Sequence, residues 1–367
     1  MRKERHYKER LFYLPLLFLT GALIFIGLVL IFSASRTTGQ SLATLFGKQL
    51  IWAVIGLVIM VLVARFDFHF WTRNGLFFYI ITLLVLTLVL VFGSGRYGTQ
   101  RWFKLGAFYL QPSEPAKLFL IFALGNYLER RRNYLGYFST TLAGFLFLLL
   151  PPLLLILLQP NLGTAFLLIP IFFAMFYAAG TPRRHLLILF LLGMASLPVL
   201  WLFLKEYQKQ RILIFLNPGA DPLGAGYNIL QSKIAIGSGG LIGKGFLKGT
   251  QTHLAFLPER HTDFIFSVLA EEWGFLGSVI LLFLYLLFLT EIFKIASFTR
   301  DRVGTYIAVG CGTMFAAQIF VNIAMTMGFL PVVGIPLPFL SYGGSSLITS
   351  LAAVGLLFSI KQRETFL

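Results

Sequence analysis

The side chains best suited to chemistry are concentrated in residues 231–277. Four carboxylates, two histidines, three lysines and an arginine occur there, whereas the chain as a whole is 57% hydrophobic and only 12% charged. A lipid bilayer tolerates irregular polar backbone only where protein or a water-filled cavity satisfies it. We therefore predict that this segment contributes to the functional site.

Asp263 is the strongest single candidate in this segment. It stands where a polar loop ends and the apolar residues Phe264, Ile265 and Phe266 begin. A carboxylate at the edge of a low-dielectric cavity gains proton affinity and can act as a general base. Two simpler roles fit the same position: an N-cap for the following helix, which Thr262 would also serve, or a solvated interfacial charge.

Two further carboxylates, Glu271 and Glu272, follow Asp263 on the same predicted helix. At about 100° per residue, Glu271 lies about 80° around the helix from Asp263 and Glu272 about 180°. Only Glu271 is therefore expected to share a cavity with Asp263. Acidic residues inside a membrane span are functional candidates, so we include Glu271 among the predicted substrate-binding residues.

A glycine-rich stretch, residues 237–249, precedes these carboxylates. It does not match the nucleotide P-loop, because Ser238 stands where the first glycine is needed and Gly245 follows Lys244 in place of Ser or Thr. Two alternatives stay open. Either the glycines let backbone N–H groups approach an anionic ligand, with Lys244 and Lys248 adding charge, or they form a tightly packed re-entrant turn with solvated lysines.

Two other polar segments interrupt the apolar pattern. Residues 94–117 carry Arg101, whose planar fork suits phosphate, and the pair Glu114 and Lys117, whose i,i+3 spacing puts both on one helix face. The pair is either an interfacial ion pair or a charged lining for an anionic substrate. Residues 326–346 contain so much Pro and Gly that we predict a broken or re-entrant element.

The elements that must position these residues are membrane spans. Soluble domains carry about 25% charged residues, about twice the fraction found here, and apolar runs of about 18 residues or more can cross a bilayer. The first run follows a basic start but is too long for a signal peptide, so it is predicted to be retained. The chain is thus predicted to be an all-α polytopic membrane protein, one domain over residues 1–367, with ten spans: 11–33, 47–66, 75–93, 114–129, 139–158, 163–180, 186–204, 264–289, 303–325 and 344–360.

The distribution of Lys and Arg predicts the orientation. Basic residues are concentrated in segments that would lie inside if the N-terminus is cytoplasmic: 1–10, 66–74, 129–134, 181–185, 290–302 and 361–367. The positive-inside rule then places both termini in the cytoplasm and one long extracytoplasmic loop, about 205–263, between spans 7 and 8. The net charge of +16 is accounted for by these anchors, which argues against nucleic-acid binding. The single Cys311 excludes an intramolecular disulfide.

Several of these stretches together resemble the SEDS family (shape, elongation, division and sporulation), and most closely its elongation branch. The matching stretches are RWFKLGAFYLQPSEPAK, QPNLGT, QSKIAIGSGGLIGKG, FLPERHTDFIFSVLAEEWGFLG and GIPLPFLSYGGSS. The resemblance implies a peptidoglycan glycosyltransferase of the cytoplasmic (inner) membrane that polymerises lipid II on the outer leaflet. It also implies a class B penicillin-binding protein as partner, together with other membrane proteins of the elongation complex.

The resemblance also implies roles for single residues. The essential aspartate of the family falls on Asp263, and the Glu and Lys of its QPSE-x-x-K motif fall on Glu114 and Lys117. The family's usual Asp in QPD-x-GT is Asn161 here, so no proton-transfer role is expected at that position. The implied reaction inverts the sugar C1, which needs a base, Asp263, and cations for the departing pyrophosphate. The candidates for those cations are Lys117, Arg101, Lys244 and Lys248.

Three points are left open by the sequence. A divalent cation such as Mg²⁺ is a candidate assistant, although no cluster of His, Cys and acidic residues marks a tight metal cage. A lipid II flippase would need the same polar cavity without making bonds, and a non-catalytic scaffold would need only a partner surface. A division-type polymerase is the alternative within the family.

Overall fold

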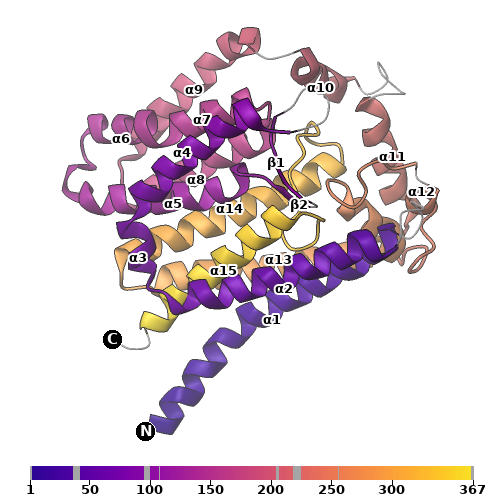
Figure 1. Ribbon diagram of the computed structural model, residues 1–367, viewed down its shortest axis with the longest axis horizontal. Coiled ribbons are helices and arrows are strands. Elements are labelled where there is room, and N and C mark those ends of the chain that lie inside the picture. Colours follow the sequence, from indigo (N-terminus) through magenta and orange to yellow (C-terminus); the bar gives the residue numbers. More distant parts are fainter. Residues whose placement is uncertain are drawn as a thin grey trace. The chain divides into compact units, whose positions relative to one another are not determined.

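The computed structural model describes residues 2–35, 42–94, 100–106, 108–203, 206–217, 225–254 and 256–364 (Figure 1). The chain forms two compact units, each assembled from segments far apart in the sequence. Unit 1 consists of Met1–Leu57, Lys209–Glu291 and Gln318–Ser350, and unit 2 consists of Val58–Gln208, Ile292–Ala317 and Leu351–Leu367. The division falls inside helices, so neither unit is a continuous stretch of chain.

The described residues are mostly helical. In chain order the elements are α1 (Arg2–Ser35), α2 (Leu42–Arg65), α3 (Phe68–Arg73), α4 (Gly75–Phe92), β1 (Phe103–Leu105), β2 (Phe108–Leu110), α5 (Ser113–Arg130), η1 (Arg132–Tyr134), α6 (Phe138–Gly144), η2 (Phe145–Leu149), α7 (Leu150–Leu158), α8 (Leu162–Ala178), α9 (Arg183–Phe203), α10 (Glu206–Leu216), α11 (Ala225–Ser238), α12 (Thr250–His253), α13 (Ile265–Phe298), α14 (Arg302–Thr326) and α15 (Gly344–Glu364).

Helices cover all ten segments predicted to be spans. Within the described part of the chain, seven helical stretches are long and apolar enough to cross a bilayer: Leu14–Ser35, Leu45–Arg65, Gly75–Phe92, Phe138–Leu158, Ile265–Phe298, Arg302–Thr326 and Gly344–Arg363. The protein is therefore a multi-span membrane protein. The helical prediction over the spans is confirmed, whereas the exact number of spans is not fixed by these lengths.

The expectation of a purely α-helical chain is wrong at one place. β1 and β2 form an antiparallel pair in which Phe103 lies opposite Leu110 and Leu105 opposite Phe108. Strands of three residues are too short to show a period-2 pattern, which is why the sequence did not reveal them. The predicted long loop also contains three helices, α10, α11 and α12.

The predicted fifth span is a composite of α6, the π-helical turn η2 and α7. Pro151 and Pro152 have no N–H, so they cannot donate to the carbonyl groups four residues earlier, at Phe147 and Leu148. The Tyr79 hydroxyl from α4 supplies the missing donor, at 2.8 Å from the Phe147 oxygen and 3.1 Å from that of Leu148. This hydrogen bond from α4 therefore replaces the backbone hydrogen bonds that the two prolines remove from the predicted fifth span.

Close packing joins α4, α5, α7 and α8 in unit 2 (Figure 1). Gly75 permits the closest approach, because a Cβ there would collide with the backbone of Phe122 on α5. Phe78 and Phe119 stack with ring centroids 5.5 Å apart. At one end of this unit, the ring of His69 lies between Asp67 (3.1 Å) and Asp301 (3.0 Å).

Candidate active site

Asp263 lies in a turn that leads directly into α13, as its position in the sequence predicted. The residue is half-buried, and the three residues that follow it are buried apolar side chains of the core of unit 1. Thr262, which the sequence offered as an alternative N-cap, instead donates its hydroxyl to the Glu259 backbone oxygen at 3.1 Å. The turn therefore presents a carboxylate at a boundary between loop and helix.

The third polar segment, predicted to be broken or re-entrant, holds this turn in place. Between α14 and α15 the described residues are not helical. The buried Asn322 amide donates to the Asp263 backbone oxygen at 3.1 Å and to the Ile335 oxygen at 2.7 Å. Ser341 donates to the Thr262 oxygen at 2.6 Å. A Cβ on Gly334 would lie 3.4 Å from an Asp263 carboxylate oxygen, so this segment runs directly past the acid.

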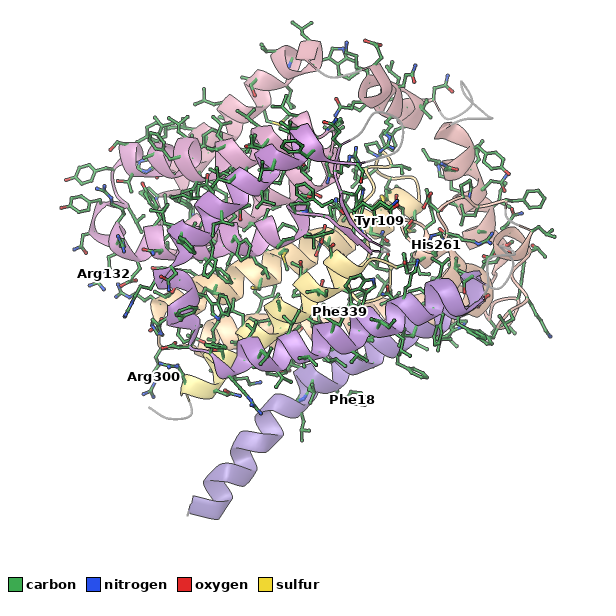
Figure 2. All side chains as sticks on the ribbon, in the orientation of Figure 1. Phe18, Tyr109, Arg132, His261, Arg300 and Phe339 are labelled. Carbon is green, nitrogen blue, oxygen red and sulfur yellow. The ribbon has the colours of Figure 1, made fainter. Side chains whose placement is uncertain are left out.

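Burial in this turn lowers the pKa of two residues that precede Asp263, Arg260 and His261. Burial lowers the pKa of Arg260, whose Nε donates to the Ala34 oxygen at 2.9 Å. Burial also lowers the pKa of His261 below 6.5; the Arg260 charge adds to this shift and Glu259 opposes it. The Tyr342 backbone N–H donates to the His261 oxygen at 2.8 Å, and the two rings meet edge to face (His261 is labelled in Figure 2). The lowered pKa favours the neutral form of His261, two residues before Asp263.

The glycine-rich stretch docks into a break in α13. Gly274 has φ +67°, which interrupts the helix and frees the carbonyls of Glu271 and Glu272 and the N–H groups of Phe275 and Leu276. The stretch replaces each lost bond. The N–H groups of Lys244 and Gly245 donate to the Glu271 and Glu272 oxygens, each at 3.0 Å. Those of Phe275 and Leu276 donate to the oxygens of Gly240 (2.9 Å) and Leu241 (3.0 Å).

This exchange of hydrogen bonds bears on the two alternatives for residues 237–249. The Lys244 and Gly245 N–H groups donate to α13 and cannot at the same time donate to a phosphate. Gly243 is required for the docking, since its φ is +80° and a Cβ there would collide with the Glu272 backbone. These contacts favour the tightly packed turn, and anion binding by Lys244 and Lys248 stays a prediction.

Glu271 fixes the rest of the same turn. Its side chain is fully buried, and its two oxygens accept hydrogen bonds from residues in the glycine-rich stretch and directly after it. One oxygen accepts from Lys244 Nζ (2.9 Å), Thr250 Oγ1 (3.3 Å) and the Gln251 N–H (2.8 Å); the other accepts from the Thr252 N–H (3.1 Å) and Thr252 Oγ1 (2.8 Å). The predicted substrate contact of Glu271 stays a prediction, and these contacts favour a positioning role.

Neighbouring Glu272 binds α1, because its carboxylate accepts a hydrogen bond from Ser33. Lys244 keeps about a quarter of its side chain exposed beside Glu271. Lys248 is exposed on the turn. The two lysines thus stay candidates for an anionic ligand, and neither role is tested by the structure.

Glu114 and Lys117 form a second polar cluster, in unit 2. Lys117 Nζ lies 2.9 Å from a Glu114 carboxylate oxygen, and the side chains are only 1% and 3% exposed. The pair was expected at the mouth of a span with an interfacial ion pair as the simple alternative; it is instead buried in the first turns of α5. Burying an ion pair costs desolvation free energy that its own attraction often does not recover. Stability alone therefore does not explain why this pair is buried.

Arg101 and Asn161 lie in the same unit as this pair. Arg101 Nε donates to the Gln159 oxygen at 3.0 Å, and its Nη2 donates to the Pro160 oxygen. Asn161 caps α8 by accepting from the Thr164 N–H at 3.4 Å, and its amide donates to the Ser113 hydroxyl at 3.2 Å. Asn161 fills both roles at once, with its side-chain oxygen as the acceptor and its amide as the donor. The pyrophosphate role of Arg101 stays a prediction.

The most informative residues that sequence reasoning missed are Asn322 and Ser341, which bind the backbone around Asp263. Both are buried polar side chains; Asn322 lies just before the Pro- and Gly-rich segment and Ser341 lies within it, and that combination was the available signal. Among the described residues, no group of three or more His, Cys, Asp and Glu side chains is placed to hold a metal ion.

Comparison with known proteins agrees with the resemblance seen in the motifs. The cell cycle protein family model of FtsW, RodA and SpoVE matches residues 14–365. The chain is 42% identical over 353 residues to the peptidoglycan glycosyltransferase MrdB of Escherichia coli K12, covering 96% of this chain and 94% of MrdB. It is 37% identical over 416 residues to the peptidoglycan glycosyltransferase RodA of Treponema pallidum, covering 94% of this chain and 96% of that RodA.

Two solved structures have the same fold. One is a chain in a peptidoglycan synthase complex that coordinates polymerization and crosslinking, with a TM-score of 0.81, 35% identity, and coverage of 96% of this chain and 97% of that one. The other is the rod shape determining protein RodA of Thermus thermophilus, with a TM-score of 0.71, 33% identity, and coverage of 95% and 96%. The protein belongs to the FtsW/RodA/SpoVE family, known also as the SEDS family.

Proposed function

We propose that this protein is a peptidoglycan glycosyltransferase that polymerises lipid II into glycan strands during cell elongation. The observation that carries the proposal is the fixed Asp263 turn, held by Asn322 and Ser341 at the start of α13, in a chain whose relatives are named peptidoglycan glycosyltransferases. The elongation role follows the relatives MrdB and RodA.

Asp263 is the general base in this proposal. The carboxylate removes the proton from the 4-hydroxyl of the acceptor sugar, the freed oxygen attacks C1 of the donor sugar, and the bond from C1 to the pyrophosphate breaks. The products are an inverted, β-linked glycan and undecaprenyl pyrophosphate. Such a base contributes about 10²–10⁴ to the rate, and its backbone anchors keep the carboxylate aimed at one place.

The cations Lys117, Arg101, Lys244 and Lys248, with Glu114 and Glu271 as their acidic neighbours, are the proposed contacts for substrate. The buried pair of Lys117 and Glu114 is the strongest of these, because a desolvated charge pair in a membrane protein is better explained by function than by stability. A departing pyrophosphate would gain most from a cation that is already oriented and shielded from water.

We propose that the protein crosses the cytoplasmic (inner) membrane ten times. Both termini then lie in the cytoplasm, and residues of about 205–263 form an extracytoplasmic loop. Contacts within each unit support this topology. Segments predicted to lie inside meet one another, as Asp67, Asp301 and Arg363 do around His69. Segments predicted to lie outside also meet one another, as Thr262 and Ser341 do.

We propose a class B penicillin-binding protein as the partner, and other elongation-complex membrane proteins beyond it. This follows the similarity to a chain in a synthase complex that couples polymerization to crosslinking. A divalent cation such as Mg²⁺ would have to bind chiefly through the substrate phosphates and one or two carboxylates, because Mg²⁺ accepts such sites and the described residues offer no cage of three. Mg²⁺ would add charge stabilisation there.

Labelled lipid II supplied in detergent to the purified protein and its partner tests the function. Glycan polymer should appear, and it should not appear with either buffer or partner alone. A flippase makes no polymer under these conditions. A scaffold would leave polymer formation to the partner, so polymer made equally well by the partner alone would overturn the proposal. Parallel reactions with Mg²⁺ and with a chelator test the cation.

A further inference from the structure

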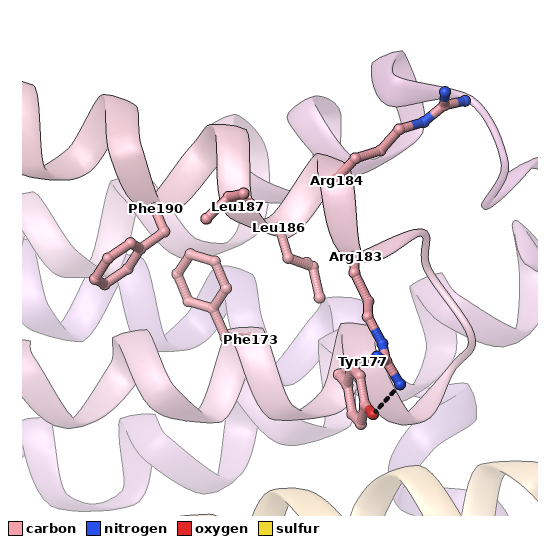
Figure 3. Close-up of a pocket in the computed structure, with 7 residues that line it drawn as sticks. All are labelled: Phe173, Tyr177, Arg183, Arg184, Leu186, Leu187 and Phe190. Carbon is pink, nitrogen blue, oxygen red and sulfur yellow. Dashed lines mark hydrogen bonds between the residues drawn. The ribbon is translucent and has the colours of Figure 1, made fainter.

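A groove of about 580 Å³ lies between α8 and α9 in unit 2, and none of its lining residues belongs to the candidate active site (Figure 3). Its wall is apolar and aromatic, and its rim carries two adjacent cations, Arg183 and Arg184. The lining residues are Phe173, Tyr177, Arg183, Arg184, Leu186, Leu187 and Phe190. The proposed reaction does not use these arginines.

Tyr177 on α8 fixes the position of the Arg183 guanidinium at the rim of the groove. Arg183 Nη2 donates to the Tyr177 hydroxyl at 3.3 Å, and its guanidinium carbon lies 5.7 Å from the centre of that ring. In Figure 3 the Arg183 side chain extends toward Tyr177, whereas Arg184 points away from the groove at its edge. Both arginines start α9, where the helix dipole also favours an anion. Tyr177 is 55% exposed, as is common for aromatic residues at a membrane interface.

The two arginines have no acidic residue near them in the sequence. The sequence contains no Asp or Glu between Glu129 and Glu206, a stretch that includes both walls of the groove. The wall itself is exposed hydrocarbon: Phe190 is 52% exposed and Leu187 57% exposed. A free inorganic phosphate would gain nothing from this wall, whereas a molecule with a phosphate and an acyl chain would match both parts.

We infer that this groove binds an anionic phospholipid, with the phosphate at Arg183, the positive charge of Arg184 at the edge of the groove, and one acyl chain along Phe173, Leu187 and Phe190. Basic pockets between membrane helices on the cytoplasmic side are suited to such headgroups. The location in the inner leaflet depends on the orientation proposed above. Lipid binding can be measured without polymerisation, so the two proposals can fail separately.

Native mass spectrometry of the purified full chain tests the inference, with dioleoyl-phosphatidylglycerol, dioleoyl-phosphatidylcholine and inorganic phosphate as probes. The tightest-bound phosphatidylglycerol should bind about 30-fold more weakly to Arg183→Gln/Arg184→Gln, because each basic residue near a lipid surface contributes about a fivefold factor to the affinity. The matched control is Arg130→Gln/Arg131→Gln, which removes the same charge from another segment predicted to be cytoplasmic. It should bind phosphatidylglycerol like wild type.

The apolar wall has its own test. Phe190→Ala should weaken binding of the dioleoyl lipid severalfold and leave the short-chain dihexanoyl lipid unaffected. Equal binding by wild type and the Arg183/Arg184 variant, or equal loss in the Arg130/Arg131 control, would overturn the inference. Inorganic phosphate that competes as well as the lipid would show a phosphate site without an acyl contact, which also overturns it. Thermal unfolding of each variant in detergent identifies any that is misfolded, and the single variant Arg184→Gln then replaces it.

Discussion

Glu271→Gln should release the glycine-rich turn from α13. The substitution keeps the size of the side chain but replaces one carboxylate oxygen by an NH₂ group. If the remaining oxygen faces Lys244 and Gln251, the new NH₂ faces the Thr252 N–H, and that buried donor loses its acceptor. An unsatisfied buried donor costs about 1–3 kcal/mol, and the bond from Lys244 loses about 1 kcal/mol when its acceptor is neutral. The expected loss is therefore about 3 kcal/mol of local stability.

Hydrogen exchange of peptides within residues 243–254 measures this loss directly. About 3 kcal/mol corresponds to local opening about 100-fold more often, and the Gln251 and Thr252 amides should exchange faster by that factor. Peptides from α14 should be unchanged. The matched control is Glu259→Gln, the same chemical change at an exposed carboxylate of the same loop, which should leave exchange in the turn as in wild type.

The same variant separates the two roles considered for Glu271. A positioning residue loses polymerisation together with protection of the turn. A substrate ligand loses polymerisation while the turn stays protected. Wild-type exchange rates in Glu271→Gln would refute the reasoning that the five hydrogen bonds to this carboxylate hold the turn in place.

Three other perturbations follow from the same geometry. Lys117→Met should lower the free energy of unfolding by about 3 kcal/mol, because it leaves Glu114 buried without its cation; a loss under 1 kcal/mol in thermal unfolding would instead indicate an exposed pair. Asn322→Leu removes the amide that anchors the Asp263 backbone, so kcat for polymerisation should fall about tenfold with partner binding unchanged, and an unaltered kcat would exclude this anchor from catalysis. Burial lowers the pKa of His261, so as pH falls below about 6.5 the unfolded chain takes up the proton first and stability declines. His261→Gln should flatten that decline in unfolding temperature between about pH 7 and 5.5, and an undiminished decline would assign the acid sensitivity to other groups.

The sequence predicted the helices well because apolar runs of span length have few alternatives in a membrane protein. It also predicted the turn at Asp263, since the change from polar to apolar residues is abrupt there. The pair Glu114 and Lys117 was correctly placed on one helix face, but its burial was not foreseen, because burial depends on which helices pack around α5. Spacing along one chain carries no such information.

The break in α13 was the largest gap in the prediction. The angle between Asp263 and Glu271 was calculated for one regular helix, whereas Asp263 precedes the first residue of α13; the interruption at Gly274, beyond Glu271, was not predicted at all. A glycine inside an apolar run is compatible with a straight helix, so its conformation could not be read from the sequence. The replacement of the broken hydrogen bonds by residues 240–245 is a tertiary contact, and it settles why that stretch is so rich in glycine.

The most direct test of the central claim is lipid II polymerisation by Asp263→Asn, assayed in the assembled complex with the cognate penicillin-binding protein. Asparagine preserves the shape of the side chain but cannot accept the proton, so the rate should fall by about 10²–10⁴. Complex formation and unfolding temperature should match wild type, because the backbone oxygen of residue 263 still accepts from Asn322. Polymerisation at the wild-type rate would contradict the assignment of Asp263 as the base.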